Sequence, residues 1–276
     1  MTEPKQVAGV DLAAAAALAQ LAARRAMAIT RETPLGAVAA KANAADVVTE
    51  VDTAVERAVR ELIADRFPDH AVVGEEYGGR PTAGPTWYCD PVDGTTNLAA
   101  GLPWTSFSLS LAVGATPLVA VVADPWRDEV LHAVAGGGCY LDDRLVLAPG
   151  QRRHQTLTGG VVLTEWARHQ PWPGMLPLLA ALADRLCTTR IMGSSTLTLA
   201  SVAAGRATAA VVGEFQPEDH LAATLLAHEA GLTVWDEDGA PTLFPARGGV
   251  MVAHPAVAAE LHAVWRDARG AGSSQK

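Results

Sequence analysis

The sequence predicts a mixed α/β protein whose two halves are built differently. Strand-like runs at 106–113, 118–124 and 129–135 follow one another through Pro- and Gly-containing turns, as in an antiparallel meander. Beyond residues 149–153, strands and helices alternate, which is typical of an α/β arrangement. Hydrophobic residues are 49% and charged residues 18% of the 276 residues, which indicates a substantial core and excludes a disordered chain. We therefore expect an N-terminal α+β domain, 1–150, and a C-terminal α/β domain, 151–276.

The first half opens with a helix that we expect over residues 10–30. Its Ala-rich part, 12–28, could be mistaken for a signal peptide, but Gln20, Arg24 and Arg25 interrupt it and alanine is only weakly apolar. An amphipathic or buried helix is the better interpretation. No run of residues combines the length and apolarity of a transmembrane span, so we expect no membrane association.

A second helix is expected to begin near residue 50. Thr49 and Asp52 have the spacing of a capping box, and apolar residues recur behind them at i, i+4 and i+7. Residues 68–70 end this helix. A short strand is then predicted at 71–73, leading into the turn that contains Glu75.

The run Asp90-Pro91-Val92-Asp93-Gly94-Thr95-Thr96-Asn97 carries most of the functional information. Residues 86–89 read as a strand that ends at Asp90, because Pro91 cannot donate a ladder hydrogen bond. Carboxylates on a rigid turn suit a hard divalent cation such as Mg²⁺. If a helix starts after Gly94, its free amides would point at an anion. A metal beside an anion cradle predicts phosphate chemistry.

Three further carboxylates fall at the ends of predicted elements. Asp52 could be only a capping residue, Glu75 only part of a solvated turn, and Asp219 only a favourable charge at a helix N-terminus. Taken alone, none of them identifies a site. Asp90 and Asp93 are less easily dismissed, because Pro91 and Gly94 dictate their geometry and two hydroxyls follow immediately.

Charge and cysteine content restrict the class of protein. The formal net charge of −9 argues against a broad nucleic-acid or anionic-membrane footprint. Cys89, Cys139 and Cys187 are odd in number and widely spaced, without the pairing of a zinc site. They predict reduced thiols in a cytoplasmic protein.

The second half follows a polar stretch, 149–153, in which Arg152 and Arg153 are interpreted as solvated linker residues. Before it, the glycines 136–138 predict a tight turn between strands. Gly205 and Gly231 stand where helices commonly end. Strands are expected at 161–164, 186–192, 208–212, 232–236 and 250–253, and helices at 175–185, 195–204, 219–230 and 255–268.

Three segments resemble successive signatures of the inositol monophosphatase family, in the family's order and spacing: 46–52, 74–76 and 90–97. Lys41 matches a further family position. The similarity spans about Lys41 to Gly231. It also includes Pro103, Ser108, and the runs 124–129, 136–138, 193–195 and 203–206.

This resemblance implies a layered αβαβα sandwich of the inositol monophosphatase and fructose-1,6-bisphosphatase type. It also implies Mg²⁺-dependent hydrolysis of a small phosphate monoester by a metal-activated water, with two or three Mg²⁺ ions. One metal would be held by Glu75, Asp90 and the Val92 carbonyl, and a second by Asp90, Asp93 and Asp219. The N-terminal domain would therefore be the metal-binding one, with the C-terminal domain completing the site.

The remaining roles that the resemblance implies concern the nucleophile and the substrate. Thr95, supported by Asp52, would orient or deprotonate the attacking water, with help from Glu75. Amides of Gly94 and Thr95 would receive the phosphate. Substrate contacts are expected from Gly193, Ser194, Ser195 and Glu214, although Ser194 or Ser195 could equally be a plain helix N-cap.

The last family signature is altered. Glu218 stands where the family usually has Trp, His220 follows the metal aspartate, and the usual substrate-binding Glu aligns with Val212 unless Glu214 takes its place. A different alcohol is therefore expected on the phosphate. Histidinol phosphate, a sugar phosphate and a 3′-phosphoadenosine-type nucleotide are rival substrates, and a non-catalytic regulatory member is the alternative of another class. The family further implies a homodimer and inhibition by lithium.

Overall fold

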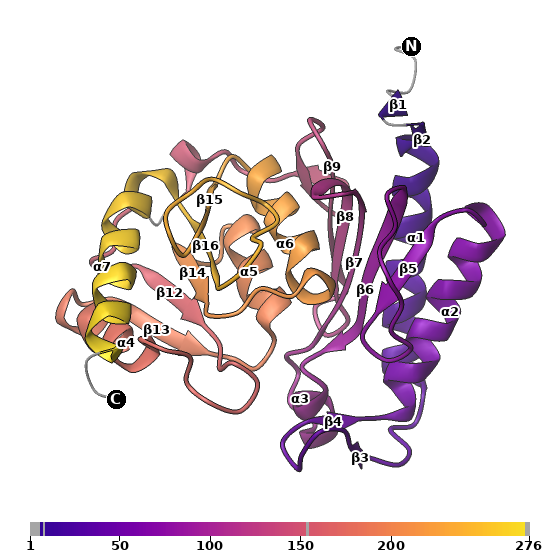
Figure 1. Ribbon diagram of the computed structural model, residues 1–276, viewed down its shortest axis with the longest axis horizontal. Coiled ribbons are helices and arrows are strands. Elements are labelled where there is room, and N and C mark those ends of the chain that lie inside the picture. Colours follow the sequence, from indigo (N-terminus) through magenta and orange to yellow (C-terminus); the bar gives the residue numbers. More distant parts are fainter. Residues whose placement is uncertain (1–5, 8, 153–154, 274–276) are drawn as a thin grey trace.

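Five layers, helix–sheet–helix–sheet–helix, make up the computed structural model, which describes residues 6–7, 9–152 and 155–273 (Figure 1). Helices α1 and α2 cover the outer face of a seven-stranded sheet, and α5 and α6 lie between that sheet and a five-stranded one. Helices α4 and α7 cover the far side. The αβαβα fold is thus confirmed. The helices are α1 (Leu12–Glu32), α2 (Glu50–Arg66), α3 (Thr95–Ala100), α4 (Met175–Asp184), α5 (Ser195–Ala203), α6 (Pro217–Glu229) and α7 (Pro255–Ser273).

The seven-stranded sheet has the order β11-β10-β9-β8-β7-β6-β5. All neighbouring strands run antiparallel except β5 and β6, which are parallel. The predicted meander is therefore confirmed, while the β10–β11 hairpin was not predicted because its strands are only two or three residues long. The strands are β5 (Ala71–Gly74), β6 (Pro85–Asp93), β7 (Ser106–Val113), β8 (Thr116–Asp124), β9 (Glu129–Val134), β10 (Cys139–Leu141) and β11 (Arg144–Leu145).

The five-stranded sheet has the order β13-β12-β14-β16-β15. Its β13, β12 and β14 are parallel, and β16 pairs antiparallel with both β14 and β15. Each predicted strand is present, shifted by two residues or fewer at its start. The strands are β12 (Val161–Thr164), β13 (Thr188–Ile191), β14 (Ala209–Val212), β15 (Thr233–Asp236) and β16 (Val250–Ala253); two-residue pairs β1–β2 (Gln6–Val7, Val10–Asp11) and β3–β4 (Ala39–Ala40, Val47–Val48) lie apart.

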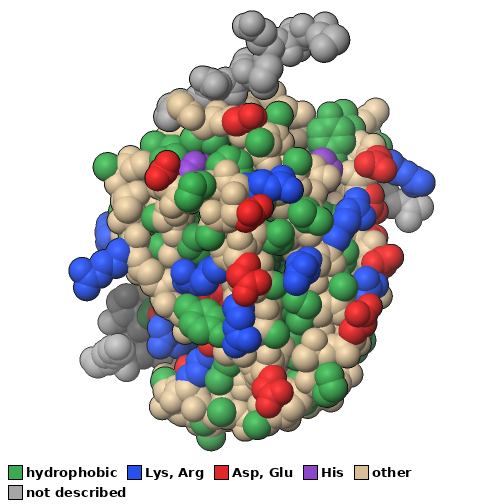
Figure 2. Space-filling view, turned by 90° about the vertical axis from the view of Figure 1, so that its right-hand side faces the viewer, with side chains coloured by type: hydrophobic (Ala, Val, Ile, Leu, Met, Phe, Trp, Pro, Cys, Tyr) green, Lys and Arg blue, Asp and Glu red, His purple; other side chains and the backbone are tan. Residues whose placement is uncertain are grey.

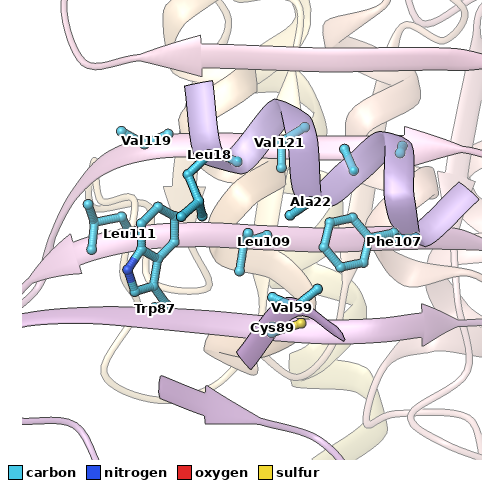
Figure 3. Packing of buried hydrophobic residues seen from close by; sticks show 14 of the residues in the cluster. Leu18, Ala22, Val59, Trp87, Cys89, Phe107, Leu109, Leu111, Val119 and Val121 are labelled. Carbon is cyan, nitrogen blue, oxygen red and sulfur yellow. The ribbon is translucent and has the colours of Figure 1, made fainter. Parts of the chain in front are cut away.

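Helix α1 is long and apolar enough to cross a membrane by length and composition, but 44% of its apolar window is buried inside the protein. Figure 3 shows Leu18 against the fully buried Trp87, and Ala22 between Leu109 and Val121 of the underlying sheet. Burying one Leu side chain contributes about 1.5–3 kcal/mol. The small Ala22 lets the helix approach the sheet closely. The interpretation as an amphipathic or buried helix is confirmed, whereas the expectation that no run reaches transmembrane length and apolarity was wrong.

The outer surface of this helical layer is solvated. Figure 2 shows basic and acidic side chains interspersed with apolar ones over this face. Such mixed charge is typical of a surface in contact with water.

Strand β6 does not end at Asp90, so that expectation was wrong. The pairing with β7 continues from Asp90 opposite Ser108 to Asp93 opposite Ser106, with a register shift between them. Pro91 lies inside this β-bulge, where the ladder is interrupted and its missing N–H costs no hydrogen bond. The bulge is what carries Asp90 and Asp93 onward to the end of the sheet.

Arg152 is not a solvated linker residue. Its side chain is buried and donates to the carbonyls of Leu147 (2.9 Å), Val202 (2.5 Å) and Ala203 (3.0 Å). Two of these carbonyls belong to the last turn of α5, where helix carbonyls lack partners and a cation is favourable. Arg153 lies outside the described residues.

Candidate active site

The end of β6 and the start of α3 form the centre of the site. Asp90 is buried, and one of its carboxylate oxygens accepts from the Val92 N–H at 2.9 Å. Gly94 follows in a left-handed conformation, φ 95°, and a Cβ there would stand 2.7 Å from the Gly193 carbonyl oxygen. A glycine is therefore required at this turn. The helix expected after Gly94 is present as α3.

Thr95 joins this turn to helix α2. Its hydroxyl lies 2.8 Å from Asp52 Oδ1 and 2.9 Å from the Val92 carbonyl oxygen. Asp52 is fully buried, and its Oδ2 accepts from both the N–H and the hydroxyl of Thr49. Burial raises the pKa of Asp52, while the hydrogen bonds from Thr49 and Thr95 oppose that rise. The capping carboxylate thus also supports Thr95.

Glu75 lies on the turn after β5, where it is exposed and accepts from Lys41 Nζ at 2.8 Å. The same ammonium donates to Glu76 at 2.6 Å. Burial alone would lower the pKa of Lys41, but hydrogen bonds and charges from both glutamates outweigh it and raise that pKa. The turn is held from below by Glu56, a fully buried carboxylate that accepts from the N–H groups of Glu76 (2.7 Å) and Tyr77 (3.2 Å).

Asp93 is held by the beginning of α5, although it belongs to β6. Its Oδ2 accepts from the Ser194 hydroxyl at 2.5 Å and from the Thr196 N–H at 2.7 Å. The Ser195 hydroxyl lies 3.4 Å from Oδ1. Thr196 also donates its hydroxyl to the backbone carbonyl of Asp219, at the start of α6. Both middle helices therefore meet at Asp93.

His220 lies one residue beyond Asp219 and is buried. Its Nδ1 accepts from the Gln216 N–H at 2.9 Å, and its Nε2 lies 2.9 Å from Ser195 Oγ. Burial lowers the pKa of His220 to about 3, so the imidazole is neutral.

The loop that carries Gly193 is organised by a carboxylate that sequence reasoning missed. Glu165 is buried and accepts from the N–H groups of Met192 (3.0 Å) and Gly193 (2.8 Å) and from the Thr198 hydroxyl (2.6 Å). Asn97 holds the same loop by donating to the Met192 carbonyl at 2.8 Å. Glu165 and Glu56 share no motif with the other carboxylates. A Glu directly after a strand or on the buried stripe of a helix was their only signal.

These residues surround a cleft of about 520 Å³ that continues into a smaller recess of about 170 Å³. All of the predicted metal-binding residues line the recess, together with Gly94 and Thr95. The larger cleft is lined by Gly193, Ser195 and Glu214 among others, with Glu214 exposed. The predicted metal-binding residues at the recess are Glu75, Asp90, Val92, Asp93 and Asp219.

Ser194 takes a different place from the one expected for a substrate contact. It is buried, caps α5 by accepting from the Leu197 N–H, and directs its hydroxyl at Asp93. This geometry favours the N-cap alternative for Ser194 and gives it a structural link to Asp93.

Burial and, after it, mutual repulsion disfavour the charged forms of the carboxylates in the recess. Burial raises the pKa of Asp90 well above its usual range, and the neighbouring Glu75, Asp219 and Asp93 raise it further. Burial likewise raises the pKa of Asp219, with Asp93 and Glu75 adding to the effect. Within the described residues, no three His, Cys, Asp or Glu side chains already form a preassembled metal-binding group. In the described part of the chain, the charge of Lys41 opposes the rise in the pKa of Asp219 but does not cancel it.

Comparison with known proteins places the chain among related sequences. Residues 3–269 match the model of the inositol monophosphatase family. The chain is 34% identical to the Nus factor SuhB of Pasteurella multocida over 78% of this chain and 81% of that protein. It is 30% identical to an inositol-1-monophosphatase of Bacillus subtilis, over 79% and 82% respectively.

A solved inositol monophosphatase from Anabaena (Nostoc) sp. PCC 7120 has the same fold. It superposes with a TM-score of 0.79 at 26% identity, covering 94% of this chain and 97% of that one. The family-model match over residues 3–269, the relatives and the shared fold lead to one conclusion: the chain belongs to the inositol monophosphatase family.

Proposed function

We propose that this protein is a Mg²⁺-dependent phosphatase that hydrolyses a small phosphate monoester. The observation that supports the proposal most directly is that all of the proposed metal-binding residues line one recess. They are Glu75, Asp90, Val92, Asp93 and Asp219. Thr95 lines the same recess and bonds its partner Asp52. Family membership supports phosphatase chemistry in general. The metal, the mechanism and the substrate are our inference.

The donor set fits Mg²⁺. Its members are hard oxygen ligands. The buried Asp90 is destabilised as an anion by Glu75, Asp219 and Asp93, and the half-buried Asp219 by Asp93 and Glu75. A bound cation would relieve that repulsion. We assign one ion to Glu75, Asp90 and the Val92 carbonyl, a second to Asp90, Asp93 and Asp219, and allow a third near Glu75. When bound, Mg²⁺ supplies positive charge that stabilises the phosphoryl oxygens and makes nearby water more acidic.

The remaining catalytic roles would fall to the protein's own residues. The Thr95 hydroxyl has one proton to donate, and Asp52 Oδ1 at 2.8 Å is a buried acceptor for it. With that proton directed at Asp52, the Thr95 oxygen can accept a hydrogen bond from the attacking water. Backbone amides of Gly94 and Thr95 would receive the phosphate. Glu75, at the exposed edge, would help to hold the water.

The leaving alcohol would occupy the larger cleft, whose lining includes Gly193, Ser195 and Glu214. The altered segment 212–220 contributes seven of the residues that line it. Inositol phosphate, histidinol phosphate, a sugar phosphate and a 3′-phosphoadenosine-type nucleotide remain the candidate substrates. We further propose a cytoplasmic homodimer that acts on this small metabolite without binding nucleic acid or membrane.

A regulatory role is the second candidate. It is favoured by the name Nus factor that the Pasteurella multocida relative carries. The geometry counts against a purely regulatory protein, because Thr95, Asp52 and the carboxylates around the recess are all in place. Such a protein would have no need to keep repelling carboxylates together.

The test is phosphate release from a panel of phosphorylated metabolites, with and without Mg²⁺. We expect Mg²⁺-stimulated turnover of at least one compound and near abolition of it by Asp93→Asn. Lithium should inhibit the same turnover. Full activity of Asp93→Asn would refute the mechanism, and no turnover of any compound by the wild-type protein would favour the regulatory role.

A further inference from the structure

The strongest unassigned feature of the cleft is His220, a buried imidazole with both ring nitrogens engaged. We propose that His220 is a positioning residue that turns the Ser195 hydroxyl onto Asp93 and holds the Gln216 backbone at the cleft wall. The proposal rests on the proposed function, since it assigns the purpose of this arrangement to the metal site. Three hydrogen bonds join Gln216, His220, Ser195 and Asp93 in one chain.

The hydrogen bond to Gln216 determines the tautomer. A backbone N–H can only donate, so the Nδ1 that it contacts at 2.9 Å must be the unprotonated nitrogen. The proton of the neutral ring is then on Nε2. The opposite tautomer would place two donors against each other at Gln216.

The tautomer in turn determines the direction of the Ser195 hydroxyl. Nε2–H donates to Ser195 Oγ at 2.9 Å, so the hydroxyl proton must point elsewhere. Its other close polar neighbour is Asp93 Oδ1, at 3.4 Å. The neutral His220 thereby directs the Ser195 hydroxyl, as a donor, toward Asp93, which the histidine itself does not touch.

The two carboxylate oxygens of Asp93 differ in how tightly hydrogen bonds hold them. Short hydrogen bonds from Ser194 and Thr196 fix Oδ2, whereas the contact from Ser195 to Oδ1 is long. Oδ1 is therefore oriented but keeps lone pairs that a cation can use. Residues that hold a metal-binding carboxylate in this way typically change metal affinity or activity by about 10–100-fold when they are replaced.

His220 is unsuited to be a metal ligand, because neither nitrogen has a free lone pair in this arrangement. A histidine that merely fills the core is the alternative. Phe215 lies against the ring, with centroids 5.8 Å apart, so some packing contribution is present. The experiment must separate packing from an effect that passes through Ser195.

The experiment measures direct binding of Mn²⁺, used in place of Mg²⁺, by titration calorimetry on the full chain, together with thermal unfolding. His220→Leu and Ser195→Ala should each weaken Mn²⁺ binding about tenfold. The double variant should be no weaker than either single one, because both act through one hydrogen bond. His220→Gln, which keeps one acceptor and one donor, should recover most of the affinity. His228→Gln, exposed at the other end of α6, is the matched control and should bind as wild type.

Unchanged Mn²⁺ affinity in His220→Leu and Ser195→Ala, or additive losses in the double variant, would overturn the inference. If His220→Leu does not fold, Ser195→Ala and His220→Gln decide: the first must bind about tenfold more weakly and the second close to wild type. A wild-type protein that binds Mn²⁺ and releases phosphate while these variants match it defeats this inference alone. A wild-type protein that binds no Mn²⁺ defeats the proposed function.

Discussion

Replacing Thr95 by valine tests the proposed mechanism with a minimal change in shape. The variant keeps the β-branched side chain and removes the hydroxyl that lies 2.8 Å from Asp52 and 2.9 Å from the Val92 carbonyl. Loss of a proton-transferring group typically costs about 10²–10⁴-fold in rate. At about 1.36 kcal/mol per tenfold, this is roughly 2.7–5.4 kcal/mol of barrier.

The cost in stability should be smaller. Asp52 loses one of its three donors and keeps the N–H and the hydroxyl of Thr49. A hydrogen bond to a charged group contributes about 1.5–3 kcal/mol, and water entering from the recess can replace part of it. We therefore expect Thr95→Val to remain folded while kcat falls at least a hundredfold.

The assay is Mg²⁺-dependent phosphate release with the best compound from the metabolite panel, alongside thermal unfolding. Thr95→Ser should retain most of the activity, because it keeps the hydroxyl. Thr53→Val is the matched control, since Thr53 lies beside Asp52 on α2 and its hydroxyl donates to the Glu50 carbonyl. Thr95→Val with wild-type kcat would refute the role of this hydroxyl.

Two further predictions concern stability. Arg152→Met leaves the carbonyls at the end of α5 without their donors, so it should lower the free energy of unfolding by about 2–4 kcal/mol, measured by urea titration. The same change at the exposed Arg190 should have little effect. Equal effects of the two substitutions would contradict the capping role of Arg152. The Nδ1 of His70 accepts from Trp87 at 3.1 Å, and burial lowers the pKa of His70. The stability that neutral His70 contributes is therefore present above the unfolded pKa of about 6.5 and is lost as the pH falls toward the lower folded value. The stability advantage of the wild type over His70→Gln should shrink between pH 7 and pH 5, and a constant difference would be evidence against this linkage.

Structural features that depend only on residues close together in the sequence could be predicted from it. The capping pair Thr49–Asp52, the turn at Gly94 and the meander after it all rest on spacing and turn chemistry, and the structure contains each of them. The end of β6 was misjudged because Pro91 was treated as a strand terminator. A β-bulge accommodates the proline, and a bulge depends on the partner strand β7, which no local pattern reveals.

The missed residues all act over long distances in sequence. Glu165 binds the N–H groups of Met192 and Gly193, and Arg152 binds carbonyls about 50 residues further along the chain. Each looks like an ordinary surface residue in a polar stretch. Their partners are brought near only by the packing of α5 between the sheets. A buried charge of this kind can be recognised in the sequence only after the fold is known.

Thr196 shows how the two halves of the chain depend on one another at the site. Its N–H donates to Asp93 on β6 and its hydroxyl to the carbonyl of Asp219 on α6, so one residue of α5 sets the spacing of two proposed ligands of one cation. Those carboxylates repel each other, and burial makes the repulsion more costly. The position of α5 is itself secured by Arg152 at its other end. Preorganisation of the site is thus supported by hydrogen bonds made far from the chemistry, and the repulsion that they maintain is what a bound cation would relieve.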